Sequence, residues 1–378
     1  MSLPLSLYIH FPWCIRKCPY CDFNSHTLKG AIPEEDYIDA LIADLEHDLV
    51  LRPAKKLTSI FLGGGTPSLF SPAAIARLLT AIAARIPFAA DCEITLEANP
   101  GTVEQQRFEG FKAAGINRLS IGVQSLQDDK LKALGRIHGA KEAIKATEMA
   151  HAAGFTTFNM DLMFGLPKQS IDDALYDLTT AIALQPTHIS WYQLTLEPNT
   201  LFHHQPPILP DDEYLWEMQQ LGQALLAQAG FVQYEVSAYS KVGHQCRHNL
   251  NYWQFGDYLG IGAGAHAKIT SHLGVSRSSK WKNPKDYLQA KNNSYIAETQ
   301  IIATNELPFE FMLNVLRLQQ PIPVNLFAER TGCTVDQIEA QITQAVNRGL
   351  LCCQQQQWHV TDLGRQFLND LTAIFLPY

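Results

Sequence analysis

The sequence predicts an α/β protein built on a partial (β/α)6 TIM-like barrel, with a capping segment and a small C-terminal winged-helix-like domain. Short apolar runs alternate with helical stretches over roughly the first 230 of the 378 residues, a pattern typical of βα units in a parallel sheet. The alternation stops near residue 231, and a new series of helical segments begins near residue 301. We therefore expect a barrel at 1–230, a capping segment at 231–300 and a C-terminal domain at 301–378.

The barrel prediction depends on six apolar runs and six helical stretches. The predicted strands are 7–11, 59–62, 93–97, 118–122, 157–164 and 188–196. The predicted helices are 34–50, 72–85, 103–114, 140–153, 171–184 and 211–229. Several helices close on glycine, for example Gly115 and Gly230, as helix C-caps do. Because functional loops cluster at the carboxyl ends of parallel barrel strands, residues that follow the strands should share one face.

The remaining third of the chain has a different pattern. Residues 231–300 are rich in glycine and aromatic residues and show no period, so we expect them to close the barrel as a cap. Beyond them, helices at 305–318, 325–330 and 335–348 precede two strands around a glutamine turn at 354–357, and a last helix follows. This order is typical of a winged helix. Its third helix carries few Lys or Arg, which favours packing or partner binding over DNA binding.

Composition excludes several classes of function. The formal charge of −8 gives no long-range attraction to phosphate backbones, so we expect no nucleic-acid partner. No apolar stretch reaches the roughly 18 to 20 residues of a membrane span, and residues 1–20 do not resemble an export signal. We therefore expect a cytoplasmic protein. Eight cysteines, three of them within eight positions, favour metal ligation over a disulfide framework.

Those three cysteines, Cys14, Cys18 and Cys21, form a Cys-x3-Cys-x2-Cys array directly after the first predicted strand. Thiolates bind soft or borderline metals, chiefly zinc and iron–sulfur clusters. A structural zinc site needs four ligands, usually in two pairs, so zinc with a distant fourth ligand is the alternative. A four-iron cluster bound by three cysteines leaves one iron open. S-adenosylmethionine can chelate that iron through its amino and carboxylate groups, and an electron from the cluster then cleaves its sulfonium.

The array and its flanks resemble the radical S-adenosylmethionine superfamily, in the group that contains oxygen-independent coproporphyrinogen dehydrogenase. The flanks are Tyr-Ile-His-Phe-Pro at 8–12 and Gly-Gly-Gly-Thr-Pro at 63–67. The resemblance implies a radical SAM barrel with a [4Fe–4S] cluster ligated by Cys14, Cys18 and Cys21. It also implies a set of contacts to S-adenosylmethionine: Tyr8, Gly64, Gly65, Thr66, Glu97, Gln124, Arg136 and Asp161. Independently, a carboxylate at a strand end suits ribose hydroxyls, and an arginine can pair with the methionine carboxylate.

Two departures from the dehydrogenase argue against its activity. That enzyme has a fourth cysteine two positions after the third, where this chain has Phe23. It also has a long N-terminal extension that helps to enclose the substrate, whereas 13 residues precede Cys14 here. We therefore expect an incomplete porphyrinogen pocket and no active coproporphyrinogen III dehydrogenase. That oxidative decarboxylation in haem biosynthesis, and other adenosyl-radical reactions, stay as alternatives.

A third mark is the His-Asn-Leu-Asn-Tyr-Trp segment at 248–253, which matches the His-Asn-x-x-Tyr-Trp motif of the HemW family of haem chaperones. A neutral imidazole such as that of His248 is a good axial ligand for haem iron, and Tyr252 and Trp253 offer flat apolar surface. A histidine beside aromatic residues is more often a hydrogen-bonded core residue. Cys246 could be a second haem-directed ligand, although an inert buried thiol is the commoner role, and His266 has too little context to assign.

The resemblance to this family implies a binding protein more than an enzyme. Such a chaperone holds the cluster, S-adenosylmethionine and haem, and transfers haem to an acceptor, for instance a respiratory haem protein. The cluster would need an external electron donor. With no predicted transmembrane segment, association with a membrane would be peripheral and through a partner.

Overall fold

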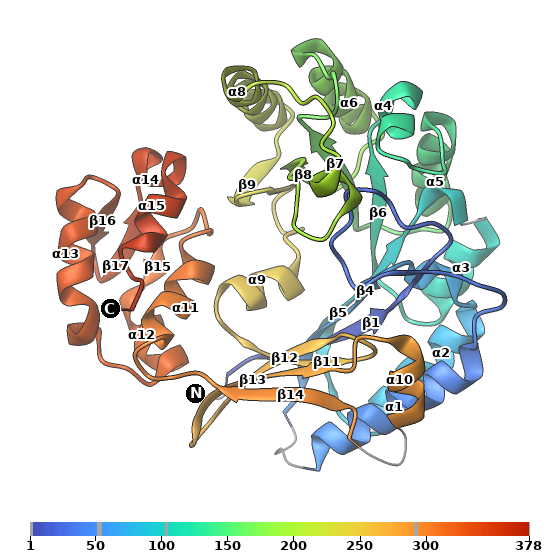
Figure 1. The fold of residues 1–378 in the computed structure, drawn as a ribbon, viewed down its shortest axis with the longest axis horizontal. Coiled ribbons are helices and arrows are strands. Elements are labelled where there is room, and N and C mark those ends of the chain that lie inside the picture. The colour runs from blue at the N-terminus through green and yellow to red at the C-terminus, as the bar shows by residue number, and fades with distance from the viewer. Residues whose placement is uncertain (1–2, 51–54, 103–104, 291–293, 378) are drawn as a thin grey trace.

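The computed structural model of the chain describes residues 3–50, 55–102, 105–290 and 294–377. Their backbone forms an open twisted sheet of 12 strands with helices along its outer side and a small C-terminal unit beside it (Figure 1). The strand order is β14-β13-β12-β11-β1-β4-β5-β6-β7-β8-β10-β9. None of the helices in these ranges is long and apolar enough to cross a membrane.

The six predicted strands are confirmed and pair in parallel in chain order. They are β1 (Leu5–Phe11), β4 (Leu57–Gly64), β5 (Phe88–Ala98), β6 (Arg118–Gln124), β7 (Phe158–Phe164) and β8 (His188–Gln193). Two short strands, β2 (Trp13–Cys14) and β3 (His26–Thr27), pair with each other inside the loop after β1. The carboxyl ends of the six strands therefore meet at one edge of the sheet, as expected.

The helices between these strands are also confirmed. They are α1 (Glu34–Leu49), α2 (Pro72–Ala83), α3 (Gln105–Ala113), α5 (Ala140–Ala152), α6 (Ile171–Ala183) and α8 (Asp212–Gln228). The predicted start of the third helix, at 103, lies outside the described residues. The sequence patterns missed several short helices: η1 (Pro67–Leu69), η2 (Pro100–Thr102), α4 (Asp128–Ala133), α7 (Leu201–His204) and α10 (Pro284–Gln289).

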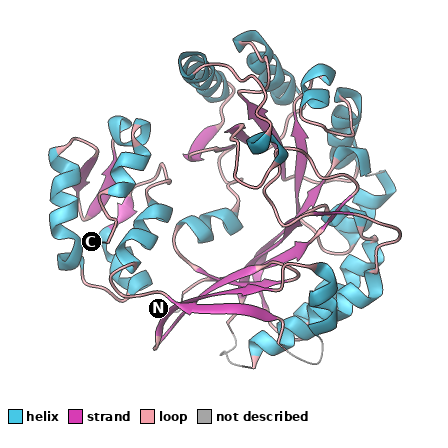
Figure 2. Cartoon of the chain, in the orientation of Figure 1, coloured by secondary structure: helices cyan, strands magenta, loops and turns pink. Residues whose placement is uncertain are grey.

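The two faces of the curved sheet differ in polarity because successive strand residues point to opposite sides. Alternate residues such as Leu7 and Ile9 of β1 are buried and belong to the main hydrophobic core, together with residues of the helices that line the outer face (Figure 2). The other set faces the concave side and is largely polar, for example Glu97, Ser120 and Asp161. The concave face of the sheet is therefore a polar surface that can contact ligands.

The prediction that residues 231–300 close the barrel is wrong. This segment extends the sheet at both edges, through β9 (Val232–Glu235), β10 (Ala238–Ser240), β11 (Asp257–Ile261), β12 (His266–Ser271), β13 (Gly274–Lys280) and β14 (Ile296–Ile301). Strand β11 pairs in parallel with β1 and so occupies the position that a closing strand would need. The helix α9 (Arg247–Trp253) packs against β4, β1 and β11. The barrel therefore stays open, with β9 and β14 as the edge strands of the sheet.

The C-terminal part has its own core. The predicted helices and hairpin are present, and β15 adds a third strand to the hairpin: α11 (Leu307–Val315), β15 (Ile322–Pro323), α12 (Val324–Thr331), η4 (Val335–Ile338), α13 (Glu339–Asn347), β16 (Leu351–Gln354), β17 (Gln357–Val360), α14 (Asp362–Gln366) and α15 (Leu368–Ala373). Phe311, Phe327 and Trp358 are at the centre of a separate hydrophobic cluster. The divisions at 230/231 and 300/301 stay predictions.

A buried ion cluster joins β13 to α1. Lys280 Nζ donates to Asp44 Oδ1 at 2.6 Å and to Asp48 Oδ1 at 2.8 Å, and all three side chains are less than 5% exposed. Asp44 Oδ2 also accepts from the hydroxyl of Tyr287 and the backbone N–H of Gly262. Burial raises the pKa of Asp44 to about 6, against the lowering effect of Lys280. The cluster thereby fixes the turn after β11.

Replacing Lys280→Ala should destabilise the fold by about 3–5 kcal/mol, because it leaves two buried carboxylates without their cation. A carboxyl group whose folded-state pKa is raised stabilises the fold when protonated, and this contribution is lost as the pH rises through about 6. The deficit relative to wild type should therefore shrink between about pH 8 and about pH 5 in urea unfolding. Lys285→Ala, which removes an exposed lysine nearby, is the control. A deficit that does not depend on pH would contradict this account.

Candidate functional site

The three clustered cysteines lie in the loop between β1 and α1, which we call the cluster loop (residues 12–28). Cys14 ends β2, and the backbone N–H of Cys21 donates to the carbonyl of Cys18 at 3.1 Å. All three cysteines line one cavity of about 500 Å³, the cluster cavity, at the carboxyl ends of the central strands. The structure thus brings the predicted ligands together where the sequence placed them.

Each thiol in this cavity has a polar neighbour. Thr66 Oγ1 donates to Cys14 Sγ at 3.5 Å, Ser25 Oγ lies 3.7 Å from Cys21 Sγ, and Arg136 Nη1 donates to Cys18 Sγ at 3.6 Å. Burial raises the pKa of Cys14 and of Cys21, while these hydroxyl contacts act in the opposite direction. A positively charged metal group would supply the rest of the stabilisation that thiolates need here.

A zinc site and a four-iron cluster place different demands on their ligands. A zinc site needs side chains that converge on one ion, whereas each cysteine of a four-iron cluster binds a different iron. In the described ranges, no group of three His, Cys, Asp or Glu side chains lies close enough together to hold one metal ion.

The same cavity gathers all but one of the residues predicted to contact S-adenosylmethionine. Its lining includes Gly64, Gly65, Thr66, Glu97, Gln124, Arg136 and Asp161. Tyr8 instead lines a neighbouring cavity of about 370 Å³, the inner cavity, which also contains Gly64, Glu97 and Asp161. The two cavities are therefore adjoining parts of one polar interior. Contact with a cofactor stays a prediction for each residue.

Two carboxyl groups, those of Glu97 and Asp161, line both the cluster cavity and the inner cavity. Glu97 Oε2 accepts the backbone N–H of Gly64 at 3.0 Å, and Asp161 accepts from Ser120 Oγ and Asn159 Nδ2. Burial, and then the charge of Asp161, raise the pKa of Glu97 to about 8. Burial also raises the pKa of Asp161. A bound cation or a hydroxyl donor would favour the ionised form of both groups.

The Gly64 turn depends on glycine. Its φ is +107°, and a Cβ atom there would lie 2.4 Å from the His10 ring. With no side chain, the backbone N–H can approach Glu97 and the cavity directly. The expected contact of this glycine turn with S-adenosylmethionine stays a prediction.

Arg136 is a buried cation with a free donor. Its Nη2 donates to the carbonyl of Gly122 at 2.7 Å and its Nη1 contacts Cys18, but its Nε has no hydrogen-bond partner among the described residues. A buried, unpaired N–H costs free energy until a ligand satisfies it. A carboxylate in the cluster cavity would supply that acceptor. Gln124, also in this cavity, accepts from the Tyr192 hydroxyl at 2.8 Å.

His248 lies on α9, in the wall shared by the inner cavity and a larger cavity of about 830 Å³ beside the cluster loop, the lateral cavity. Its Nδ1 is 3.2 Å from Ser59 Oγ, and its ring packs on Phe61 with centroids 5.1 Å apart. Burial, and then Arg118, lower the pKa of His248 to about 3, so the imidazole is neutral near pH 7. Its Nε2 forms no hydrogen bond within the described part of the chain.

Cys246 is not placed to act with His248. Its side chain is fully buried, it lines none of the three cavities, and its Sγ donates to Glu93 Oε1 at 3.5 Å. Burial raises the pKa of this thiol to about 12. The structure therefore favours the inert role over haem ligation.

Several site residues were not singled out from the sequence. His10 accepts from the Tyr8 hydroxyl at Nδ1 and donates from Nε2 to the carbonyl of Asn24, which connects β1 to the cluster loop. Burial lowers the pKa of His10 to about 4, which keeps this neutral tautomer. Arg118 is 2% exposed and faces the inner cavity. The sequence signal that could have identified Arg118 is its spacing of two residues from Ser120, and of four from Gly122, which places the three residues on one face of β6.

Changing any one of Cys14, Cys18 and Cys21 to Ala should abolish the brown iron–sulfur chromophore, because each is expected to hold a separate iron. Iron and sulfide content and the absorption spectrum of anaerobically purified protein measure this. The exposed Cys353→Ala is the control and should keep the chromophore. A full four-iron complement in any of the three variants would overturn that cysteine as a ligand.

Glu97→Gln should weaken S-adenosylmethionine binding by about tenfold, since the amide keeps the Gly64 contact but loses the negative charge. Without ligand, the rise of the pKa of Glu97 from 4.5 to about 8 implies that wild type loses stability as the pH rises from about 4.5 to about 8. The Glu97→Gln variant should not lose stability in this way, because its amide does not ionise. Isothermal titration and thermal unfolding across that range measure both effects, and unchanged affinity would exclude a contact between Glu97 and the cofactor.

Comparison with known proteins agrees with this geometry. The Radical SAM superfamily model matches residues 8–179, and the HemN C-terminal domain model matches residues 302–367. The fold is similar to the structure described as coproporphyrinogen III oxidase (HemN) from Escherichia coli, with a TM-score of 0.84, 23% identity, and coverage of 99% of this chain and 90% of that one. At that identity the likeness concerns the fold alone.

Several curated relatives carry the name Heme chaperone HemW, among them the following three. The Escherichia coli (strain K12) protein is 51% identical over 374 residues, 99% of this chain and 98% of the relative. The Haemophilus influenzae protein is 52% identical over 378 residues, with the same coverage. The Bacillus subtilis (strain 168) protein is 32% identical over 379 residues, 98% of this chain and 99% of the relative. Full-length similarity at this level, together with the clustered thiols and His248, shows that the chain belongs to the HemW family of the radical SAM superfamily.

Proposed function

We propose that this protein is a haem chaperone that binds haem through His248 and transfers it to an acceptor protein. The observation that carries the proposal is the state of this imidazole, which is neutral, lines both the inner and the lateral cavity, and has no hydrogen bond at Nε2 among the described residues. A neutral imidazole nitrogen is the common protein ligand for haem iron. The relatives named Heme chaperone HemW support the same function.

The surroundings of His248 suit a flat apolar ligand. Tyr8 and Phe61 lie within 6.3 and 5.1 Å of its ring, measured between centroids. Tyr252, on the same helix, lines both cavities that meet at His248. Aromatic side chains provide large contact area at low entropic cost, as a porphyrin face requires.

The family also brings a [4Fe–4S] cluster and S-adenosylmethionine. Cys14, Cys18 and Cys21 would hold the cluster, and the free Nε–H of Arg136 and the Glu97 carboxylate would bind the charged ends of the cofactor. When bound, the pair supplies reductive cleavage of a sulfonium. The proposal further includes an electron donor, a specific acceptor such as a respiratory haem protein, and a cytoplasmic location.

Phe23 supports binding over porphyrinogen chemistry. It stands where the dehydrogenase has its fourth cysteine, is 58% exposed and lines all three cavities. An apolar ring there adds contact surface for a flat ligand and offers no thiol. We therefore infer that the chain binds a tetrapyrrole without decarboxylating it. Formation of protoporphyrinogen IX from coproporphyrinogen III by the reconstituted protein would overturn this part.

His248→Ala should lower the affinity for haem by at least about tenfold and change the absorbance spectrum of the bound haem, because the axial nitrogen is lost. Anaerobic haem titration followed by absorbance measures both quantities. His244→Ala is the control, since His244 lies on the same segment, bonds Thr157 and lines none of the cavities. Identical spectra and affinities for wild type and His248→Ala would remove His248 as the ligand.

A further inference from the structure

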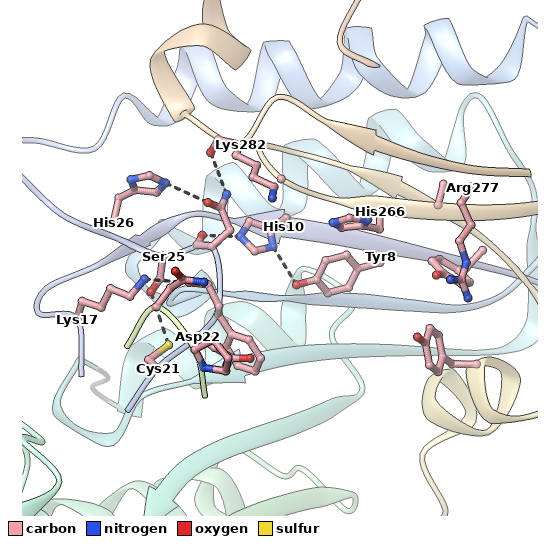
Figure 3. Close-up of a pocket in the computed structure, with 18 of the residues that line it drawn as sticks. Tyr8, His10, Lys17, Cys21, Asp22, Ser25, His26, His266, Arg277 and Lys282 are labelled. Carbon is pink, nitrogen blue, oxygen red and sulfur yellow. Dashed lines mark hydrogen bonds between the residues drawn. The ribbon is translucent and has the colours of Figure 1, made fainter. Parts of the chain in front are cut away.

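The lateral cavity differs from the other two in the charge of its lining. It is enclosed by the cluster loop, β1, α9 and the strands β11–β13 (Figure 3). Three cations, Lys17, Arg277 and Lys282, face it against a single acid, Asp22. In a chain with a formal charge of −8, this is a local reversal of sign. Clefts lined by one sign of charge concentrate ligands of the opposite sign.

The three cations are not equally available. Lys17 Nζ donates to the carbonyl of Phe23 at 3.1 Å, and both Nη atoms of Arg277 are held by the Glu310 carboxylate at 3.0 and 2.6 Å. Lys282 Nζ has no hydrogen bond or ion pair in the part of the chain that the structure describes. Its ammonium group is therefore the cation that can pair with a ligand at no cost to an existing contact.

The position of Lys282 is nevertheless fixed. Its backbone carbonyl accepts the Asn24 side-chain amide at 2.9 Å, so the lysine is attached to the cluster loop. Two residues earlier in the chain, Lys280 is anchored in the buried ion cluster. His266, on β12, presents an exposed ring to the same cavity. Burial, and then Lys282 and Arg277, lower the pKa of His266, so its ring is a neutral donor near pH 7.

The lining of the cavity also includes aromatic side chains. They are Tyr8, Phe23, Tyr252 and Tyr258, and His248 lines the same cavity. The cavity thus combines flat apolar surface, a potential iron ligand and, from the segment that follows β13, a free cation. Haem has the matching chemistry, since it is a flat apolar ring with two propionate carboxylates on one edge.

We propose that Lys282, with His266 beside it, binds the propionate carboxylates of haem in the lateral cavity while His248 ligates the iron. The inference rests on the proposed haem-binding function and adds a second, anionic point of recognition to it. Charge-assisted hydrogen bonds to a carboxylate would orient the ring so that its iron faces α9. The cargo would then lie beside the cluster loop, outside the cluster cavity.

The test compares haem with haem dimethyl ester, in which both carboxylates are blocked, on wild type, Lys282→Ala and the control Lys285→Ala. Lys285 is exposed, lines none of the cavities, and its removal changes the net charge equally. We expect Lys282→Ala to weaken haem binding by about tenfold and to leave the affinity for the ester unchanged. The spectrum of bound haem should not change, because His248 is intact. Lys282→Arg should restore most of the affinity.

The outcomes separate the two proposals. If wild type binds neither ligand, the haem-binding function fails and the inference fails with it. If wild type binds both ligands but Lys282→Ala binds haem as tightly as Lys285→Ala does, only the propionate contact is overturned. An equal loss for haem and for the ester would show that Lys282 shapes the cavity and does not recognise carboxylate. Circular dichroism and cluster content confirm that each variant is folded.

Discussion

The geometry of the site depends on one side chain, Asn24. Its amide donates to the carbonyls of Ala263 and Lys282, which lie 239 and 258 residues further along the chain, at 2.9 Å each. Its own backbone carbonyl accepts from His10. The cluster loop has little regular structure of its own, so these three bonds attach it to β1 and to the strands at the far edge. Gly264 permits this contact, since a Cβ atom there would lie 2.3 Å from the Asn24 amide nitrogen.

The two faces of the open sheet have different roles. Apolar residues on the outer face pack against helices and supply the main core, which leaves the concave face free to be polar. Buried polar groups are costly unless they are paired. Many are paired here, as in the bonds between Asn159, Ser120 and Asp161, while Arg136 Nε and Arg118 Nε have no partner among the described residues. Of these two residues, Arg136 lines the cluster cavity and Arg118 lines the inner cavity.

Local patterns were enough to predict the repeating half of the molecule. The periodic patterns of strands and helices can be recognised in short stretches of sequence, and the array that begins at Cys14 can be recognised from the spacing of its cysteines alone. Pairing between distant segments is not local, which is why β11 beside β1 was missed and closure was wrongly expected. The same applies to Lys282 and Asn24. Nothing near either residue in the sequence shows that they meet. His248 could be found from its motif, but its neutral state results from burial that only the fold reveals.

Phe23 belongs to the linings of all three cavities. One exposed ring borders the cluster cavity, the inner cavity and the lateral cavity at once. Any ligand that turns the ring changes the space left for a ligand in the adjoining cavity. Thermodynamic linkage then requires the effect to be reciprocal. The factor by which the first ligand changes the affinity for the second equals the factor by which the second changes the affinity for the first. A single rotamer can thus couple the state of the cofactor to the release of the cargo.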